Sequence, residues 1–155
     1  CYGLPVLAPA DGIVAEVGTS CPNAQIMLDE TVHFGGGDIR GNYVLIDHGN
    51  DEFSCLCHLR PGGVLVEAGR HVQRGQRVGF CGSSGCSSHP HLHFHIQKGQ
   101  SFYTSLGVPV RFAGVAAAPA PNYAAADPRS VPPEAYDDFP PFLTRGLRVE
   151  PAGGE

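Results

Sequence analysis

Four of the eight histidines in this chain fall within residues 89–95. Successive residues of a β-strand point to opposite faces, so a strand here would separate imidazoles from apolar side chains. The imidazole face is His91, His93 and His95, and the apolar face is Leu92, Phe94 and Ile96. Neutral imidazole is the commonest protein ligand of transition metals, and histidines one residue apart on a strand can share one pocket. The pattern therefore favours a zinc site on this strand.

The elements that must position these histidines are predicted to be β-strands. The 155 residues have one domain's length and include 21 Gly, 14 Pro and no Trp. Together with many short Val, Ile and Leu runs, this composition favours an all-β domain with many turns. The net charge of -5 gives no reason to expect nucleic acid or an anionic membrane as a partner. No stretch is apolar for long enough to be a transmembrane segment.

Turn residues divide the first two thirds of the chain into short strands. Residues 4–18 are predicted to form two strands joined at Asp11-Gly12, and residues 25–28 a short strand. A hairpin is expected from residues 42–48 and 52–59, with His58 on its second arm and an end at Pro61. Gly-separated short strands follow, then a loop over residues 82–90 and the histidine strand.

The composition changes after residue 112. Residues 113–155 hold 8 of the 14 Pro and 10 Ala, with little apolar periodicity. Such a segment buries too little apolar surface to offset its ordering entropy. The expected organisation is therefore a folded domain over 1–112 and a Pro/Ala-rich, mostly disordered tail over 113–155.

The six cysteines leave their redox state open. Their spacing is compatible with three disulfides or with free thiols. Cys55 and Cys57 are predicted to be buried small hydrophobes that face away from His58 if residues 53–59 form a regular strand. Cys81 and Cys86 flank a flexible loop that permits a disulfide.

Five sequence blocks resemble those of the lysostaphin-like (LytM-like) zinc endopeptidases, in the order found in that family. They are residues 8–14 (APADGIV), 41–49 (GNYVLIDHG), 57–59 (CHL), 75–79 (GQRVG) and 90–94 (PHLHF). The resemblance covers roughly residues 3–112. It implies a compact antiparallel β-sheet or sandwich domain of the duplicated hybrid motif type, with a narrow groove floored by the sheet.

The same resemblance implies the residues of the site and the substrate. His93 corresponds to a zinc ligand, and His58 and His91 correspond to the two catalytic histidines that line the groove. His95 stands where the family often has an acidic or amide residue, so it is expected on the groove side rather than as a ligand. The implied substrate is a peptide bond of bacterial peptidoglycan, which implies a location in the periplasm or cell wall.

One part of the family pattern is missing. Two further zinc ligands, a His and an Asp, lie upstream of the block that begins here at Gly3, so a missing N-terminal segment is expected. His33 and Asp38 form the only nearby His/Asp pair, in a Gly-rich loop. They are considered as substitute ligands, but a flexible polar loop is the favoured interpretation. Asp11, Asp47 and His48 are expected to orient the backbone of turns.

Two other functions compete with the peptidase. A peptidoglycan-binding or regulatory module would keep the groove without the metal, and the missing ligands favour it. A lipoyl or biotinyl carrier would need an exposed lysine at a hairpin tip, whereas Lys98, the one lysine in the chain, follows the histidine strand. The carrier is therefore the weakest of the three hypotheses.

Overall fold

The computed structural model describes residues 1–26, 32–33, 37–126, 129–130 and 142–152. The chain divides into two compact units, Cys1–Val108 and Pro109–Glu155. The histidines and the motifs above all lie in the first unit.

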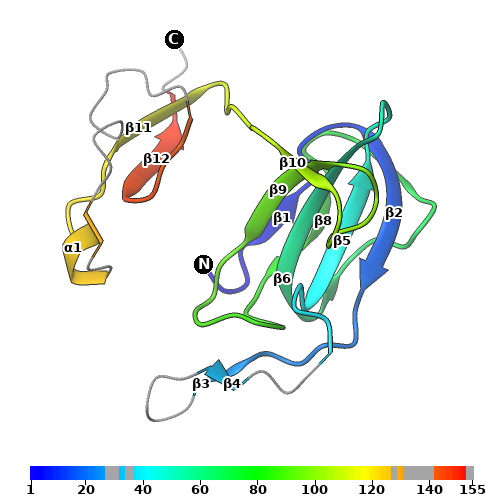
Figure 1. The fold of residues 1–155 in the computed structure, drawn as a ribbon, viewed down its shortest axis with the longest axis horizontal. Coiled ribbons are helices and arrows are strands. Elements are labelled where there is room, and N and C mark those ends of the chain that lie inside the picture. Colours follow the sequence, from blue (N-terminus) through cyan, green and yellow to red (C-terminus); the bar gives the residue numbers. More distant parts are fainter. Residues whose placement is uncertain (27–31, 34–36, 127–128, 131–141, 153–155) are drawn as a thin grey trace. The chain divides into compact units, whose positions relative to one another are not determined.

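Within the described part of the first unit, the main feature is an eight-stranded antiparallel sheet (Figure 1). Its strands are β1 (Pro5–Leu7), β2 (Gly12–Gly18), β5 (Asn42–Asp47), β6 (Glu52–Val64), β7 (His71–Val72), β8 (Arg77–Cys81), β9 (His93–Lys98) and β10 (Leu106–Val108). The order is β1-β8-β6-β5-β2-β7, and β9 pairs with both β6 and β10. A separate two-stranded sheet pairs β3 (Gln25–Ile26) with β4 (Val32–His33). The all-β, antiparallel class is confirmed.

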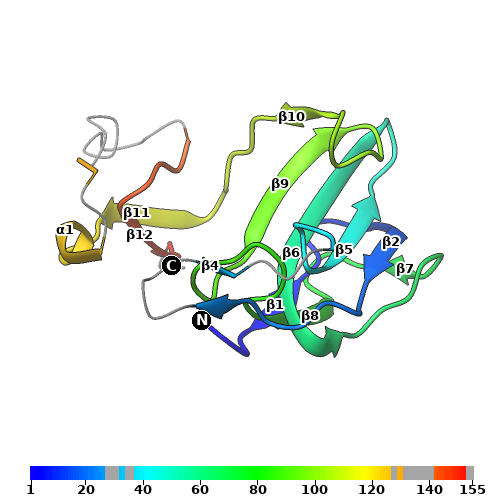
Figure 2. The same cartoon turned by 60° about the horizontal axis from the view of Figure 1, so that its bottom comes forward.

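The long strand β6 organises the sheet (Figure 2). Its first part, from Glu52 to Cys57, pairs with β9, whereas Leu59 and Val64 pair with β8. His58 lies between these two parts. The strand that carries one predicted catalytic histidine is therefore hydrogen-bonded to the strand that begins at His93.

Apolar side chains cover both faces of β5 and β6. One cluster of buried residues comprises Val6, Ala8, Val14, Val44, Ile46, Leu56, Leu59, Val72, Val78 and Cys81. The cluster on the opposite face comprises Tyr43, Leu45, Phe53, Cys55 and Cys57. Cys55 and Cys57 are 0% and 1% exposed, so the prediction that they are buried is confirmed.

The two strands predicted in residues 4–18 are present as β1 and β2, although they pair with other strands, β1 with β8 and β2 with β5 and β7. One local prediction was wrong. Pro61 does not end β6, which continues to Val64 with an irregular pairing between Leu59 and Val64. Proline has no backbone N–H to donate, so a strand tolerates it where the pairing is already interrupted.

The second unit contains the hairpin of β11 (Val115–Pro119) with β12 (Leu147–Pro151) and the short helix α1 (Tyr123–Ala126). The predicted division into 1–112 and a mostly disordered 113–155 stays a prediction. Much of that tail, residues 127–128, 131–141 and 153–155, lies outside the described residues.

No helix in the described parts of the chain has the length and hydropathy to cross a membrane.

Candidate active site

Three histidine rings converge where β6, β9 and the loop before β9 meet. The ring centroid of His58 lies 4.6 Å from that of His91 and 5.9 Å from that of His93. His95 continues the row, with its centroid 5.2 Å from that of His93. The structure thus brings together the three predicted site residues, although His58 is more than 30 residues away from His91 and His93 in the sequence.

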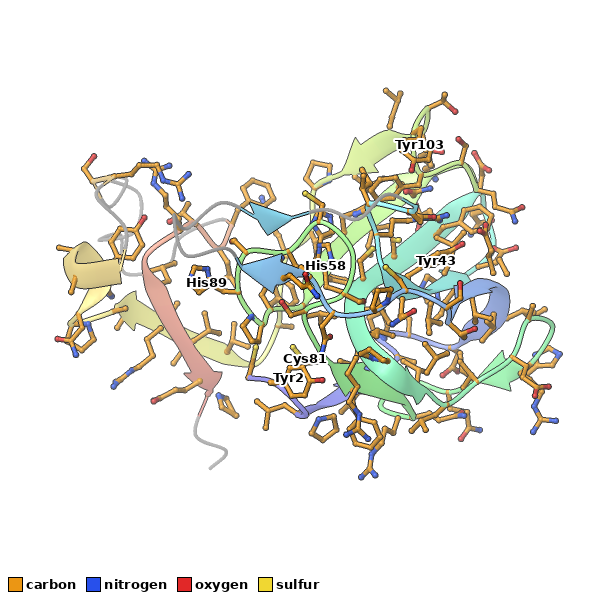
Figure 3. The ribbon with its side chains drawn as sticks, turned by 90° about the horizontal axis from the view of Figure 1, so that it is seen from below. Tyr2, Tyr43, His58, Cys81, His89 and Tyr103 are labelled. Atoms are coloured by element: carbon orange, nitrogen blue, oxygen red, sulfur yellow. The ribbon has the colours of Figure 1, made fainter. Side chains whose placement is uncertain are left out.

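A β-bulge turns His58 into this cluster. The pairing of β5 with β6 steps from Asn42–Leu59 to Val44–Leu56, so Cys57 and His58 together oppose Tyr43. His58 has a φ of 61°, in the left-handed region that few non-glycine residues adopt. A bulge of this kind changes the direction of a side chain, and here it moves the imidazole off the face that regular alternation with Leu56 would give it. Figure 3 labels His58 and Tyr43.

The bulge also corrects the expected orientation of the cysteines. Cys57 pairs with His93 and Cys55 with His95, and cross-strand partners lie on the same face of a sheet. The two cysteines therefore lie on the histidine face of β9, below the rings. A hydrogen bond with Cys55 and burial raise the pKa of the Cys57 thiol.

His91 is held by a loop rather than by the strand predicted for residues 89–96. β9 begins at His93, and His91 forms an isolated bridge in which its backbone N–H donates to Gly82 at 3.3 Å. Leu92 is 38% exposed instead of lying in the core. A Cβ atom on Gly82 would overlap the backbone of Arg60, so glycine allows this loop to approach β6.

Backbone carbonyls fix the proton positions on His58 and His91. The Nδ1 atom of His58 lies 2.8 Å from the carbonyl oxygen of Ser84, and that of His91 lies 2.8 Å from that of His89. A carbonyl only accepts, so both Nδ1 atoms carry the proton. In the neutral rings Nε2 is then the basic nitrogen, available to take a proton.

A chain of hydrogen bonds fixes His93 in the opposite way. The side-chain amide of Gln97 donates to the carbonyl of Gly99 at 2.8 Å, so its oxygen accepts from Nε2 of His95 at 2.7 Å. The Nδ1 atom of a neutral His95 then accepts from Nε2 of His93 at 3.1 Å. This leaves the lone pair of His93 on Nδ1, available to a metal or a proton.

The environment favours neutral rings in the cluster. Burial lowers the pKa of His58, and the neighbouring His91 lowers it further although the Ser84 carbonyl opposes the shift. Burial and the adjacent histidines also lower the pKa of His93. Neutral imidazole is the form that binds metals and accepts protons, so these shifts suit both roles.

Arg40, just before β5, contacts the backbone of His58. Its backbone carbonyl accepts the N–H of His58 at 2.9 Å, and its guanidinium binds the carboxylate of Asp38 through Nη2 at 2.6 Å and Nε at 3.0 Å. Asp38, one of the two residues considered as substitute ligands, is therefore engaged by an arginine. The side chain of the other, His33, lies outside the described part.

The described residues supply one part of a metal site. His93 offers an unshared Nδ1 lone pair, which fits a zinc ligand, but no three His, Cys, Asp or Glu side chains in the described ranges are placed to hold a metal ion together. A catalytic zinc needs about three protein ligands. The described residues alone therefore do not complete one.

An antiparallel sheet with clustered histidines is what the resemblance to the lysostaphin-like domains implies, and comparison with known families agrees. Residues 1–105 match Peptidase family M23, and the chain belongs to this family. The resemblance seen in the five sequence blocks is confirmed.

Relatives match over part of their length. An uncharacterized metalloprotease of Haemophilus influenzae is 36% identical over 96 residues, which is 61% of this chain and 16% of the relative. The peptidoglycan DD-endopeptidase ShyA of Vibrio cholerae is 45% identical over 56 residues, or 36% of this chain and 13% of the relative. The chain thus spans less than a fifth of either protein.

Solved structures share the fold. The catalytic domain of the prophage-encoded M23 protein EnpA from Enterococcus faecalis superposes with a TM-score of 0.51 at 25% identity, covering 69% of this chain and 67% of that one. The antimicrobial peptidase lysostaphin from Staphylococcus simulans gives a TM-score of 0.50 at 26% identity, covering 69% and 38%.

Sequence reasoning missed the residues that orient the histidines. The acceptors for His58 and His91 are backbone carbonyls, which leave no signal in residue type. Gln97 could have been found from the sequence, because residues 93, 95 and 97 are every second residue of one strand and so share a face.

Proposed function

We propose that this chain is the part of a zinc-dependent endopeptidase that hydrolyses peptide bonds in bacterial peptidoglycan. The observation that carries the proposal is the convergence of His58, His91 and His93, each with one ring nitrogen left available for chemistry. Membership of Peptidase family M23 and the name of the ShyA relative support the substrate. A peptidoglycan substrate in turn places the protein in the periplasm or cell wall.

The available nitrogens suggest a separate role for each histidine. His93 would hold the zinc ion through Nδ1, with the remaining ligands supplied from outside the described residues. Zinc, when bound, polarises a carbonyl and makes bound water more acidic. His58 and His91 would take the proton of the attacking water on Nε2, hydrogen-bond the oxyanion and return the proton to the leaving amine.

The test uses the full gene product that contains this chain. Its zinc content is measured by elemental analysis, and purified peptidoglycan is digested with it before and after removal of zinc by a chelator. New amino termini, identified by mass spectrometry of the released fragments, are expected only with zinc bound. Intact peptidoglycan after incubation with the zinc-loaded protein would contradict the proposal.

A second function, a peptidoglycan-binding module without activity, is favoured by one observation. The described residues contain no three-residue metal group. This function predicts that the full gene product contains no zinc and sediments with peptidoglycan without cleaving it.

A further inference from the structure

Two cysteines far apart in the sequence meet beside the loop that carries His91. The Sγ atoms of Cys1 and Cys81 are 3.3 Å apart, although 80 residues separate them. Both side chains are thiols in this structure. Neither is part of the histidine cluster.

The backbone, rather than flexible side chains, holds these thiols together. The N–H of Gly3 donates to the carbonyl of Cys81 at 2.8 Å, and the N–H of Cys81 donates to the carbonyl of Leu4 at 2.9 Å. A turn closed by a 3.0 Å bond from the N–H of Leu4 to the carbonyl of Cys1 then directs Cys1 back towards β8. Figure 3 labels Cys81 and Tyr2, the residue that follows Cys1.

We propose that Cys1 and Cys81 form a disulfide bond by exchange with an external disulfide. The proposal does not depend on the peptidase activity. The exposed Cys1 attacks one sulfur of the oxidant, giving a mixed disulfide and releasing one thiol. Cys81 then loses its proton and attacks the sulfur of Cys1, releasing the second thiol. Two protein thiols and one external disulfide thus become one protein disulfide and two external thiols.

Access explains the order of these steps. Cys1 is exposed, whereas Cys81 is 3% exposed and burial raises the pKa of its thiol. A buried thiol of raised pKa is a poor first nucleophile, so Cys81 reacts only once the adjacent Cys1 carries the oxidant.

A second thiol pair in the chain provides an internal contrast. The Sγ atoms of Cys55 and Cys57 are also 3.3 Å apart, but both side chains are buried on one strand. No external disulfide can reach them in the folded protein. The Sγ of Cys81 contacts Cys1, so the Cys81–Cys86 disulfide that the sequence permits is not favoured.

The disulfide would fix the base of the His91 loop. The thiol of Cys1 donates to the carbonyl of Pro90 at 3.1 Å, and Cys81 precedes Gly82, which pairs with His91. The bond would tie the segment before β1 to β8 at this point and close a loop of 81 residues, counted from Cys1 to Cys81. A loop of this size constrains the unfolded chain strongly.

The experiment uses the full 155-residue chain with Cys21→Ser and Cys86→Ser, which leaves the two contacting pairs. The reduced protein is incubated with oxidised glutathione, alkylated and digested with trypsin without reduction. We expect residues 1–40 and 78–98 to appear as one cross-linked species that separates on reduction. The melting temperature should rise by about 10 °C on oxidation and return when the bond is reduced.

Cys1→Ser in the same background is the control, because an exposed serine at this position leaves the core unchanged. It should abolish both the cross-link and the temperature shift. The proposal is overturned if the two peptides stay separate, if Cys1 remains joined to glutathione alone, or if the cross-link joins Cys55 to Cys57.

Discussion

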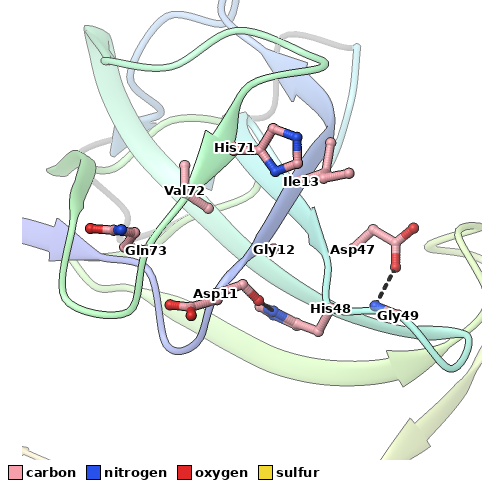
Figure 4. Close-up of a pocket in the computed structure, with 9 residues that line it drawn as sticks. All are labelled: Asp11, Gly12, Ile13, Asp47, His48, Gly49, His71, Val72 and Gln73. Atoms are coloured by element: carbon pink, nitrogen blue, oxygen red, sulfur yellow. Dashed lines mark hydrogen bonds between the residues drawn. The ribbon is translucent and has the colours of Figure 1, made fainter.

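Two groups of histidines in the first unit differ in how they use their ring nitrogens. In the cluster at β6 and β9, His58, His91 and His93 each use one ring nitrogen for orientation and leave the other available. At the end of β5, a second pocket is lined by Asp11, Asp47, His48 and His71, among others (Figure 4). By residue type alone, this second group is the better metal site, since it adds two carboxylates to its imidazoles.

The second group uses its polar atoms within turns, as the sequence predicted for Asp11, Asp47 and His48. His48 contacts the carbonyl oxygen of Asp11 through Nδ1 at 2.7 Å and the hydroxyl of Ser54 through Nε2 at 2.9 Å. The Asp11 carboxylate accepts the N–H of Arg74, and that of Asp47 accepts the N–H of Gly49. Both ring nitrogens of His48 are thus engaged, whereas His58, His91 and His93 each keep one available.

The largest expected effect separates the two groups by activity. His58→Ala and His91→Ala should each reduce peptidoglycan hydrolysis by the full gene product by at least about 100-fold, because each removes a proton-transferring nitrogen. His71→Ala, from the pocket, is the matched control and should stay within about twofold of the wild type. Release of new amino termini is measured, with circular dichroism to verify folding. Near-wild-type rates in either His58→Ala or His91→Ala would refute the assigned roles.

A smaller effect is expected from the hydrogen-bond chain behind His93. His95→Leu removes the acceptor for Nε2 of His93, and loss of such a partner typically lowers metal affinity by about 10–100-fold. His95→Gln keeps an acceptor oxygen on the same strand position and should bind zinc more tightly than the leucine variant. Zinc affinity is measured by competition with a chelator on the full gene product.

The proton position on His93 gives a readout that does not depend on metal or activity. In the metal-free wild type, ¹⁵N NMR should show the proton on Nε2, and His95→Leu should lose this preference. Equal zinc affinities for the leucine and glutamine variants, with an unchanged tautomer, would show that His95 does not position His93.

Substitution in the second pocket should lower the stability of the fold rather than the activity. His48→Leu leaves the buried hydroxyl of Ser54 without its partner and frees the Asp11 carbonyl. We expect a loss of about 1–3 kcal/mol in the free energy of unfolding, measured by urea denaturation, with hydrolysis unchanged. A loss of activity at unchanged stability would instead assign His48 to the site.

The sequence predicted the class of the fold and the residues of the histidine cluster better than the strand pairings and backbone conformations that place these residues. Alternation along residues 93–98 and the β5–β6 hairpin follow from local patterns. The pairing of β1 with β8 and of β6 with β9 joins distant segments, for which local propensity carries no information. The left-handed backbone of His58 was equally hidden, since no residue type at this position signals a bulge.

The smallest expected effect concerns the ion pair that supports His58. Burial opposes ionisation of Asp38, but its hydrogen bonds and its charge interaction with Arg40 hold the pKa of its carboxyl below the usual 3.8. A carboxyl with a lowered folded-state pKa contributes stability that is complete above the unfolded value and is lost as the pH falls through the folded one. Stability of the wild type should therefore decrease below about pH 4, where Asp38→Asn should show a flatter profile.

The pair is partly exposed to solvent, so its contribution should be about 1 kcal/mol or less and should shrink at high salt. Urea denaturation between pH 3 and pH 7 measures it, with Asp47→Asn as the control because the Asp47 carboxylate binds a backbone N–H in place of a guanidinium. If both variants flatten the dependence of stability on pH equally, the Arg40–Asp38 pair makes no special contribution to stability. If only Asp38→Asn does so, the Arg40 pair stabilises the fold at the residue whose carbonyl accepts the N–H of His58.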